Sequence, residues 1–190
     1  MLNLENPQEC QINALPAHAW FLPYDQPDSP IPDYPETSTR LISLNGQWEF
    51  LFLDYPIQAI SDFEKKFSTT TRISEVHVPG CWELAGFDRP QYLNVMYPFP
   101  VNPPRVPKKN PTGIYQRHFQ IPTDWHEKEI IITFLGVSSA YEIYLNGHFI
   151  GASKGSHLMR EFLLTPHLRY DIKNTLTVIV YKWCDGAYLE

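Results

Sequence analysis

Proline is the residue that most restricts how this chain can fold, because its ring fixes φ and removes a backbone donor. Fifteen of the 18 prolines lie within the first 107 residues, where they form two clusters. The spacings in the first cluster, from Pro7 to Pro35, exclude both a helix and a strand ladder. We therefore predict that residues 1–43 form an extended arm. The arm is more apolar than a solvated tail needs to be, so we expect it to pack on a protein surface.

Residues 44–190 show the period-two alternation of half-buried strands. Trp48, Phe50 and Phe52 share one face of the first of these strands, and Asn146-Gly147 is the turn of a predicted hairpin. The predicted strands lie at 47–52, 73–78, 115–121, 129–135, 141–145, 148–151, 162–164 and 175–180. A capping-box spacing at 61–64 predicts one short helix at 62–67. Many short strands without long helices predict an all-β fold, a jelly-roll β-sandwich over residues 44–190.

Charge and cysteine usage exclude several classes of partner and compartment. Lys plus Arg number 15 against 21 Asp plus Glu, and the cations are scattered, so we expect no nucleic acid and no anionic membrane as partner. No apolar run approaches the roughly 18 residues that a membrane span needs. The three cysteines have no ligand spacing, and no signal peptide precedes them. We predict a cytoplasmic protein with free thiols.

Motifs for catalysis are missing from the sequence. It contains no nucleophile elbow, no zinc-protease motif, no P-loop and no dinucleotide fingerprint. The seven histidines are dispersed, so no metal site is predicted. Glu49, Glu142 and Asp185 lie in or beside predicted strands, but nothing in the sequence marks two of them as the facing pair that glycoside cleavage requires. We therefore assign no catalytic residue.

The connection 79–113 is long for a compact domain, and such loops are usually functional or disordered. Its prolines make it stiff and its aromatic residues argue against disorder. Tyr92, Asn94 and Tyr97 suit sugar recognition, because a carboxamide pairs with hydroxyls and aromatic rings stack on sugar faces. The alternative is that Trp82 and the two tyrosines only attach the loop to the sandwich.

Several motifs occur in a fixed order along the chain. They are Ser43-Leu-Asn-Gly-Gln-Trp-Glu-Phe50, Val78-Pro79-x-x-Trp82, Tyr92-x-Asn94-Val95-x-Tyr97-Pro98, Val101-Asn-Pro-Pro-x-Val-Pro107, Asn110-Pro-Thr-Gly-x-Tyr115, Asn146-Gly147 and Trp183-x-Asp-Gly-x-Tyr-Leu-Glu190. From about residue 6 to residue 190, the sequence resembles the N-terminal part of the long bacterial β-galactosidases of glycoside hydrolase family 2.

The resemblance implies a galactose-binding-domain-like jelly roll behind an extended arm. It also implies that the Asn94 loop reaches the edge of an active site held by a separate TIM barrel. There Asn94 would hydrogen-bond the galactose of a β-galactoside such as lactose, with Val95 lining the same spot. The family mechanism is hydrolysis with retention, by two carboxyl groups about 5 Å apart. Asn102 and Asn110, in proline-flanked turns, are expected to bond the local backbone instead.

The resemblance also implies what this chain lacks. The catalytic glutamates and the Mg²⁺ ligands of the family would lie on the barrel, and a Na⁺ ligand would lie past Glu190. We therefore assign no catalytic residue and no metal ligand to this chain. Mg²⁺ and Na⁺ are expected only in the full-length enzyme, and the isolated chain is expected to be inactive. Near the arm, Asn6 matches a peripheral metal site of some relatives, but Lys154 stands where a neutral ligand would be needed.

The partners implied by the resemblance are a β-galactoside, the remainder of the β-galactosidase chain and further subunits of a homo-oligomer. Trp20, Phe21 and Tyr24 of the arm would pack across the subunit boundary. Two alternatives stay open at this point. One is a free-standing carbohydrate-binding module without a catalytic role. The other is a relative that acts on glucuronides or mannosides.

Overall fold

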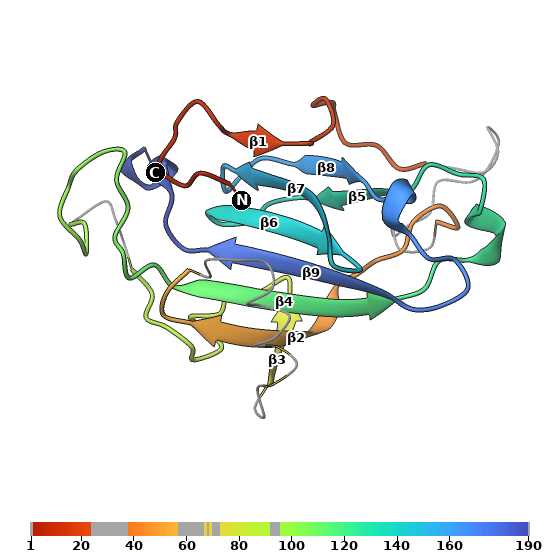
Figure 1. Ribbon diagram of the computed structural model, residues 1–190, viewed down its shortest axis with the longest axis horizontal. Coiled ribbons are helices and arrows are strands. Elements are labelled where there is room, and N and C mark those ends of the chain that lie inside the picture. The colour runs from red at the N-terminus through yellow and green to blue at the C-terminus, as the bar shows by residue number, and fades with distance from the viewer. Residues whose placement is uncertain are drawn as a thin grey trace.

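The computed structural model describes residues 2–23, 38–56, 67, 69, 73–91 and 96–189 (Figure 1). Except for Phe67, the predicted helix at 62–67 lies outside these residues. Within the described ranges, the structure has nine strands and three short 3₁₀ turns, and Phe67 and Thr69 are helical. No helix in these ranges has the length and apolar character needed to span a membrane.

Seven strands form one antiparallel sheet in the order β1-β7-β6-β9-β4-β2-β3, and β5 and β8 form a second sheet. The strands are β1 (Gln11–Ile12), β2 (Gly46–Leu53), β3 (Ser74–Val78), β4 (Thr112–Phe119), β5 (Ile131–Phe134), β6 (Ala140–Leu145), β7 (His148–Lys154), β8 (Arg160–Leu163) and β9 (Asn174–Tyr181). The 3₁₀ turns are η2 (Thr123–Trp125), η3 (Thr165–His167) and η4 (Asp185–Tyr188). The predicted all-β sandwich is confirmed.

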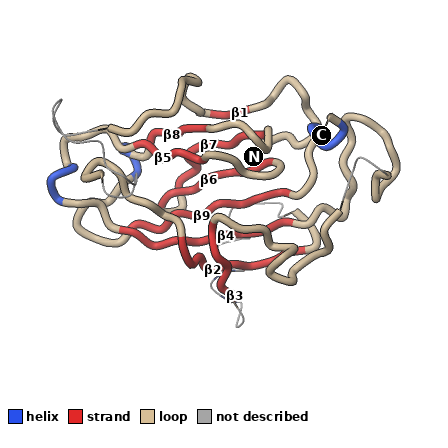
Figure 2. The backbone as a smooth tube through the Cα atoms, turned by 180° about the vertical axis from the view of Figure 1, so that it is seen from behind, coloured by secondary structure: helices blue, strands red, loops and turns tan. Residues whose placement is uncertain are grey.

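The hairpin predicted at Asn146-Gly147 joins β6 to β7, and both residues have positive φ, 53° and 84°. Positive φ at both central positions is the conformation that favours Asn-Gly in a two-residue hairpin turn. In Figure 1 and, from behind, in Figure 2, β5 and β8 lie close to β7, on one side of the large sheet.

The main core lies between the two sheets. Phe50, Tyr141 and Val178 contribute to it from the large sheet, and Ile132 and Phe162 from the small one. Phe162 is fully buried, and its ring meets the edge of the Tyr141 ring at a centroid distance of 6.3 Å. These residues lie at alternate positions of their strands, and β6 and β9 are buried on their other face as well.

The arm contributes a strand that the sequence analysis excluded. Gln11 and Ile12 pair with Ser153 and Ala152 of β7, so the prediction that the proline cluster forbids a ladder is wrong at this point. The physical reason is local: the residues between Pro7 and Pro16 all keep their N–H groups, and two of them are enough for a short edge strand.

The beginning of the arm covers the outer face of the large sheet. Leu2 is 6% exposed and belongs to a second apolar cluster with Tyr144 and Ile179. The Glu142 carboxylate, which is fully buried, accepts hydrogen bonds from the Leu2 N–H and the Tyr144 hydroxyl, each at 2.6 Å. The expected packing of the arm on a protein surface is thus confirmed for its first part. Trp20 and Phe21, by contrast, are 51% and 63% exposed.

His18 attaches the next part of the arm to β8. Its Nε2 lies 2.7 Å from the Glu161 carboxylate and its Nδ1 lies 2.7 Å from the Ala19 carbonyl oxygen. A carbonyl oxygen and a carboxylate oxygen only accept hydrogen bonds, so the two contacts together favour the imidazolium form, in which both ring nitrogens donate. The contact with the Ala19 carbonyl, followed by that with Glu161, raises the pKa of His18 above its usual 6.5.

We therefore expect the attachment through His18 to depend on pH. Because the folded-state pKa is raised, the contribution is fully present below pH 6.5 and is lost as the pH rises through the folded-state value. An NMR titration of the ring protons should give a pKa above 6.5, and a His18→Gln variant should lose the accompanying pH-dependent shifts of the Phe21 ring, which lies 5.3 Å from the imidazole. A ring pKa at or below 6.5 would contradict this expectation.

Candidate functional site

The structure describes the loop 79–113 on both sides of residues 92–95. Asn94 and Val95, the two predicted substrate-binding residues, lie outside the described residues, as does Tyr92. Their assignment stays a prediction. The structure shows which contacts attach the two described halves of the loop, residues 79–91 and 96–113, to the rest of the domain.

The first half is attached by Trp82, which is 6% exposed. Its ring stacks on Tyr115 of β4 at a centroid distance of 6.5 Å and packs beside Phe50 of β2 at 6.3 Å. Phe87, further along the loop, meets the edge of the Phe50 ring at 4.8 Å. For Trp82, therefore, the alternative reading holds: this side chain fixes the loop to the sandwich core.

Gly113 on β4 makes room for this attachment. A Cβ at this position would lie 2.6 Å from the Trp82 ring and 2.7 Å from the Phe50 ring, closer than carbon atoms can approach. We expect Gly113→Ala to lower the free energy of unfolding by about 1–3 kcal/mol, because the rings must shift out of their packing. Urea unfolding followed by circular dichroism measures this, and a change within about 0.5 kcal/mol would contradict it.

A single lysine holds the same half of the loop by charge. Lys182, the residue after β9, places Nζ 2.8 Å from a Glu83 carboxylate oxygen and 2.6 Å from one of Asp88. It also donates to the Arg89 carbonyl oxygen at 3.1 Å, and it lies 5.4 Å from the centre of the Trp183 ring. The lysine side chain is only 9% exposed, so this ion pair is shielded from solvent.

The electrostatics of the two carboxylates follow from this contact. Burial by itself would raise the pKa of Glu83 and of Asp88. Hydrogen bonds from the Cys81 thiol and Lys182 to Glu83, and from Lys182 to Asp88, outweigh burial, so both pKa values lie below their usual ones. Both carboxylates are therefore ionised at neutral pH and Lys182 has two anionic partners.

The second half of the loop is held by aromatic contacts. Tyr97 packs against Tyr188 of η4 at a ring-centroid distance of 5.5 Å, and Phe99 meets the edge of Trp183 at 5.2 Å. The Tyr188 hydroxyl donates to the Arg105 carbonyl oxygen. In Figure 1 this part of the loop, drawn in green, lies beside the C-terminal residues. Tyr97, like Trp82, is thus an attachment of the loop to the domain.

Asn110 is a correction to the sequence analysis. Its side chain was expected to bond the local backbone, but its amide donates to the Trp183 carbonyl oxygen at 2.8 Å and accepts from the Trp183 N–H at 2.9 Å. It is 1% exposed. The amide has the same donor and acceptor as a peptide group, so it extends the pairing of β4 with β9 by one further step.

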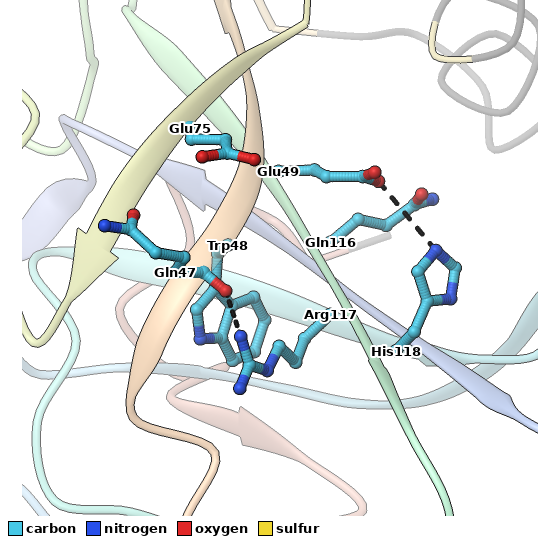
Figure 3. Close-up of a pocket in the computed structure, with 7 residues that line it drawn as sticks. All are labelled: Gln47, Trp48, Glu49, Glu75, Gln116, Arg117 and His118. Atoms are coloured by element: carbon cyan, nitrogen blue, oxygen red, sulfur yellow. Dashed lines mark hydrogen bonds and ion pairs between the residues drawn. The ribbon is translucent and has the colours of Figure 1, made fainter.

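Besides a hollow lined by Trp82 and Ala85 at the start of the loop, the described surface has a smaller one on the outer face of β2, β3 and β4 (Figure 3). Glu49 and Glu75 are cross-strand partners there, and His118 Nε2 lies 3.8 Å from the Glu49 carboxylate. The sequence analysis missed Glu75, although the register of an antiparallel pair was the signal that would have found it. The Glu49 side chain is 45% exposed, unlike the water-shielded acid of a glycosidase.

Near the arm, the ammonium of Lys154 lies within a group of oxygen atoms. It donates to the carbonyl oxygens of Asn3 at 3.1 Å and Asn6 at 2.9 Å, and it lies 3.0 Å from the Asp185 carboxylate. Its side chain is 5% exposed and that of Asp185 8%. Among the residues that the structure describes, no group of three or more His, Cys, Asp or Glu side chains is suited to a metal ion.

A double-sheet β-sandwich is an architecture that carbohydrate-binding domains share with other proteins, and here it carries a long aromatic loop fixed by distant contacts. Comparison with known proteins agrees. The profile described as "Glycosyl hydrolases family 2, sugar binding domain" matches residues 41–190, and the chain belongs to this family.

Curated relatives extend the match to almost the whole chain. A β-galactosidase of Yersinia enterocolitica is 42% identical over 187 residues, which cover 98% of this chain and 17% of the relative. A β-galactosidase of Vibrio vulnificus is 40% identical over 194 residues, covering 98% of this chain and 18% of the relative. The chain therefore spans less than one fifth of the length of these relatives.

Solved structures give the same fold. The structure of Bifidobacterium dentium β-glucuronidase, complexed with coumarin-3-O-glucuronide, matches 73% of this chain and 19% of its own, with a TM-score of 0.52 and 26% identity. A Ruminococcus gnavus β-glucuronidase matches 74% of this chain and 20% of its own, with a TM-score of 0.54 and 18% identity. At 18% identity, the second match supports only the assignment of the fold.

Proposed function

We propose that this chain is the N-terminal domain of a β-galactosidase that hydrolyses terminal β-D-galactosides, such as lactose, with retention of configuration. The observation that carries the proposal is the 42% identity to a β-galactosidase over 98% of the chain. The solved β-glucuronidases are less similar, at 26% identity for the one from Bifidobacterium dentium. This difference favours a galactoside over a glucuronide as substrate.

In this proposal the domain orients the sugar and the rest of the enzyme performs the chemistry. Asn94 hydrogen-bonds the galactose and Val95 lines the same place. The two carboxyl groups of a retaining glycosidase belong to a TIM barrel outside this chain. Both described halves of this proline-rich loop are attached to the domain, which supports the assignment of Asn94 to galactose binding. A stiff loop holds an amide in place at small entropic cost.

The metal ions of the full-length enzyme, Mg²⁺ and Na⁺, are assigned to the remainder of the enzyme. The described residues do not fit them, because the two groups of oxygen atoms around a largely buried cation already contain an ammonium, that of Lys154 and that of Lys182. No step of the proposed function therefore runs through a metal ion bound by this chain.

We further propose a cytoplasmic homo-oligomer. Cys10 and Cys81 are exposed free thiols, and Cys184 is a buried one, as a reducing compartment allows. Trp20 and Phe21 lie exposed on the arm and have the size and apolar character of subunit contacts.

A turnover assay with a chromogenic β-D-galactoside tests the proposed function. It compares this chain alone, the remainder of the same enzyme alone, and the two mixed, with the matching β-D-glucuronide as the control substrate. We expect galactoside turnover only in the mixture. Turnover by the isolated chain would contradict the proposal, because it would require a carboxylate pair within the sandwich. Preference for the glucuronide would contradict the substrate class.

A further inference from the structure

Apolar side chains are exposed along the loop between β3 and β4. Leu84, Met96 and Val101 are 84%, 78% and 63% exposed, among the highest values for large apolar side chains in the described ranges. We call the exposed surface of residues 79–91 and 96–108 the loop face. Single apolar side chains are common on protein surfaces, but several on one loop are typical of a contact with another protein.

The hollow at the start of the loop adjoins the loop face. It has a volume of about 270 Å³, and its lining is mainly apolar, with contributions from Val76, Trp82, Leu84 and Tyr115. Protein interfaces concentrate their binding energy where a large side chain of one partner fills a pocket of the other. The hollow therefore gives the loop face a place for one such side chain.

The opposite side of the loop is fixed by the domain itself. Segment 182–188 is a shared anchor of both halves: the Lys182 ammonium binds two carboxylates of the first half, and Tyr188 packs on Tyr97 of the second. Trp82 is buried in the main core. The exposed apolar groups are thus held in place without a partner, which lowers the entropic cost of association.

The charge of the loop is opposite to that of the whole chain. Residues 79–113 contain four cationic and two anionic side chains, whereas the chain has a net charge of −6. The two anions, Glu83 and Asp88, are already paired inside the domain, and two of the cations pair with acids outside the loop. Arg89 and Lys108 are exposed and form no ion pair within the described part of the chain. The loop face therefore presents a positive charge.

From these observations we propose that the remainder of the enzyme docks on the loop face, through an apolar area that is surrounded by acidic groups. This inference rests on the proposed function. The chain spans less than one fifth of the length of its β-galactosidase relatives, so a much larger part of the proposed enzyme exists to occupy this face. That part carries the carboxyl pair of a retaining glycosidase, so anionic groups are expected on it.

A second copy of this chain suits the loop face less well. In a symmetric dimer the same surface of both subunits meets, which would place Arg89 and Lys108 against their own copies. The subunit contact proposed for the arm also lies elsewhere. In Figure 1 the green half of the loop is at the left end of the domain, whereas the arm runs to the right after β1.

Thiol labelling tests the docking directly. Met96→Cys and Val101→Cys place a thiol on the loop face, and Leu135→Cys, at a side chain that is 71% exposed just after β5, is the matched control. A neutral maleimide labels each variant, and peptide mass spectrometry separates the new site from the exposed Cys10 and Cys81. We expect labelling at positions 96 and 101 to be at least about tenfold slower in the full-length enzyme than in this chain, with less than about twofold change at position 135.

Three results would overturn the inference. The first is an unchanged rate at positions 96 and 101, and the second is an equal fall at position 135. The third is slow labelling of positions 96 and 101 in this chain that becomes faster on dilution, because it would assign the loop face to a second copy. Should this chain fail to fold alone, positions 96 and 101 are compared with position 135 within the full-length enzyme.

A charge reversal tests the acidic character of the partner. Arg89→Glu combined with Lys108→Glu should raise the labelling rate at position 101 of the full-length enzyme at least about threefold, because the acidic groups opposite would then repel the loop face. Lys128→Glu combined with Lys173→Glu makes the same change in net charge at exposed positions elsewhere and should leave the rate unchanged. Equal rates in the two double variants would overturn the acidic character of the docking area.

The labelling rates do not depend on activity, so this inference and the proposed function fail separately. Slow labelling at positions 96 and 101 without galactoside turnover would contradict the proposed function and support the docking. Galactoside turnover with unchanged labelling would support the proposed function and overturn the docking.

Discussion

Replacement of Lys154 by methionine should lower the free energy of unfolding by about 3–5 kcal/mol, the usual cost of removing one partner from a buried ion pair. Methionine fills the space of the lysine stem, so the loss reports the charge rather than a cavity. The Asp185 carboxylate, 8% exposed, would lose its cation, and the carbonyl oxygens of Asn3 and Asn6 would lose a donor. The arm would be destabilised together with the sandwich.

Urea unfolding of the isolated chain measures this loss, with Lys173→Met as the exposed control that should change stability by less than about 0.5 kcal/mol. Adding Asp185→Asn to Lys154→Met should recover part of the loss, because the unpaired charge is then gone. A loss below about 1 kcal/mol for Lys154→Met would show that solvent reaches Asp185 and that the pair is not buried in solution.

Replacement of Asn94 by alanine in the full-length enzyme should lower kcat/KM for a β-D-galactoside by about ten- to 100-fold. The expected reason is the loss of a buried hydrogen bond to a sugar hydroxyl, which contributes about 1–3 kcal/mol. The stability of the isolated domain should not change, since the role assigned to Asn94 is in binding and not in the fold.

Asn102→Ala is the matched control for this measurement, because it removes the same amide from an exposed position of the same loop. We expect its kcat/KM to equal that of the unchanged enzyme. An unchanged kcat/KM for Asn94→Ala would contradict the assignment of Asn94, whatever the control shows.

The strands of the sandwich were predictable because their pattern is local. Strands β2 and β3 show their buried face as alternating residues, and the Asn-Gly hairpin is specified by two adjacent residues with positive φ. The strand β1 was not predictable in this way, because it has only two residues and its stability comes from pairing with β7, far away in the sequence. A pattern of period two needs more residues than that to be visible.

The attachment of the loop was less predictable, because its contacts join distant parts of the chain. Nothing near Lys182 in the sequence indicates that it reaches Glu83 and Asp88, and Asn110 was assigned to a local turn although its partner is Trp183. The one signal in the sequence was that Lys182, a charged residue, directly follows the apolar strand β9. Such contacts depend on which strands become neighbours, which the topology decides.

The shared anchor of the loop matters for protein engineering. Transfer of residues 79–113 alone to another β-sandwich would leave behind Lys182, Trp183 and Tyr188, the side chains that hold both halves of the loop. A graft that keeps its geometry must therefore also carry residues 182–188, at the end of a strand that pairs with the recipient's counterpart of β4. The recipient must also supply rings in the places of Phe50 and Tyr115, so the transferable unit is several pieces of sequence rather than one.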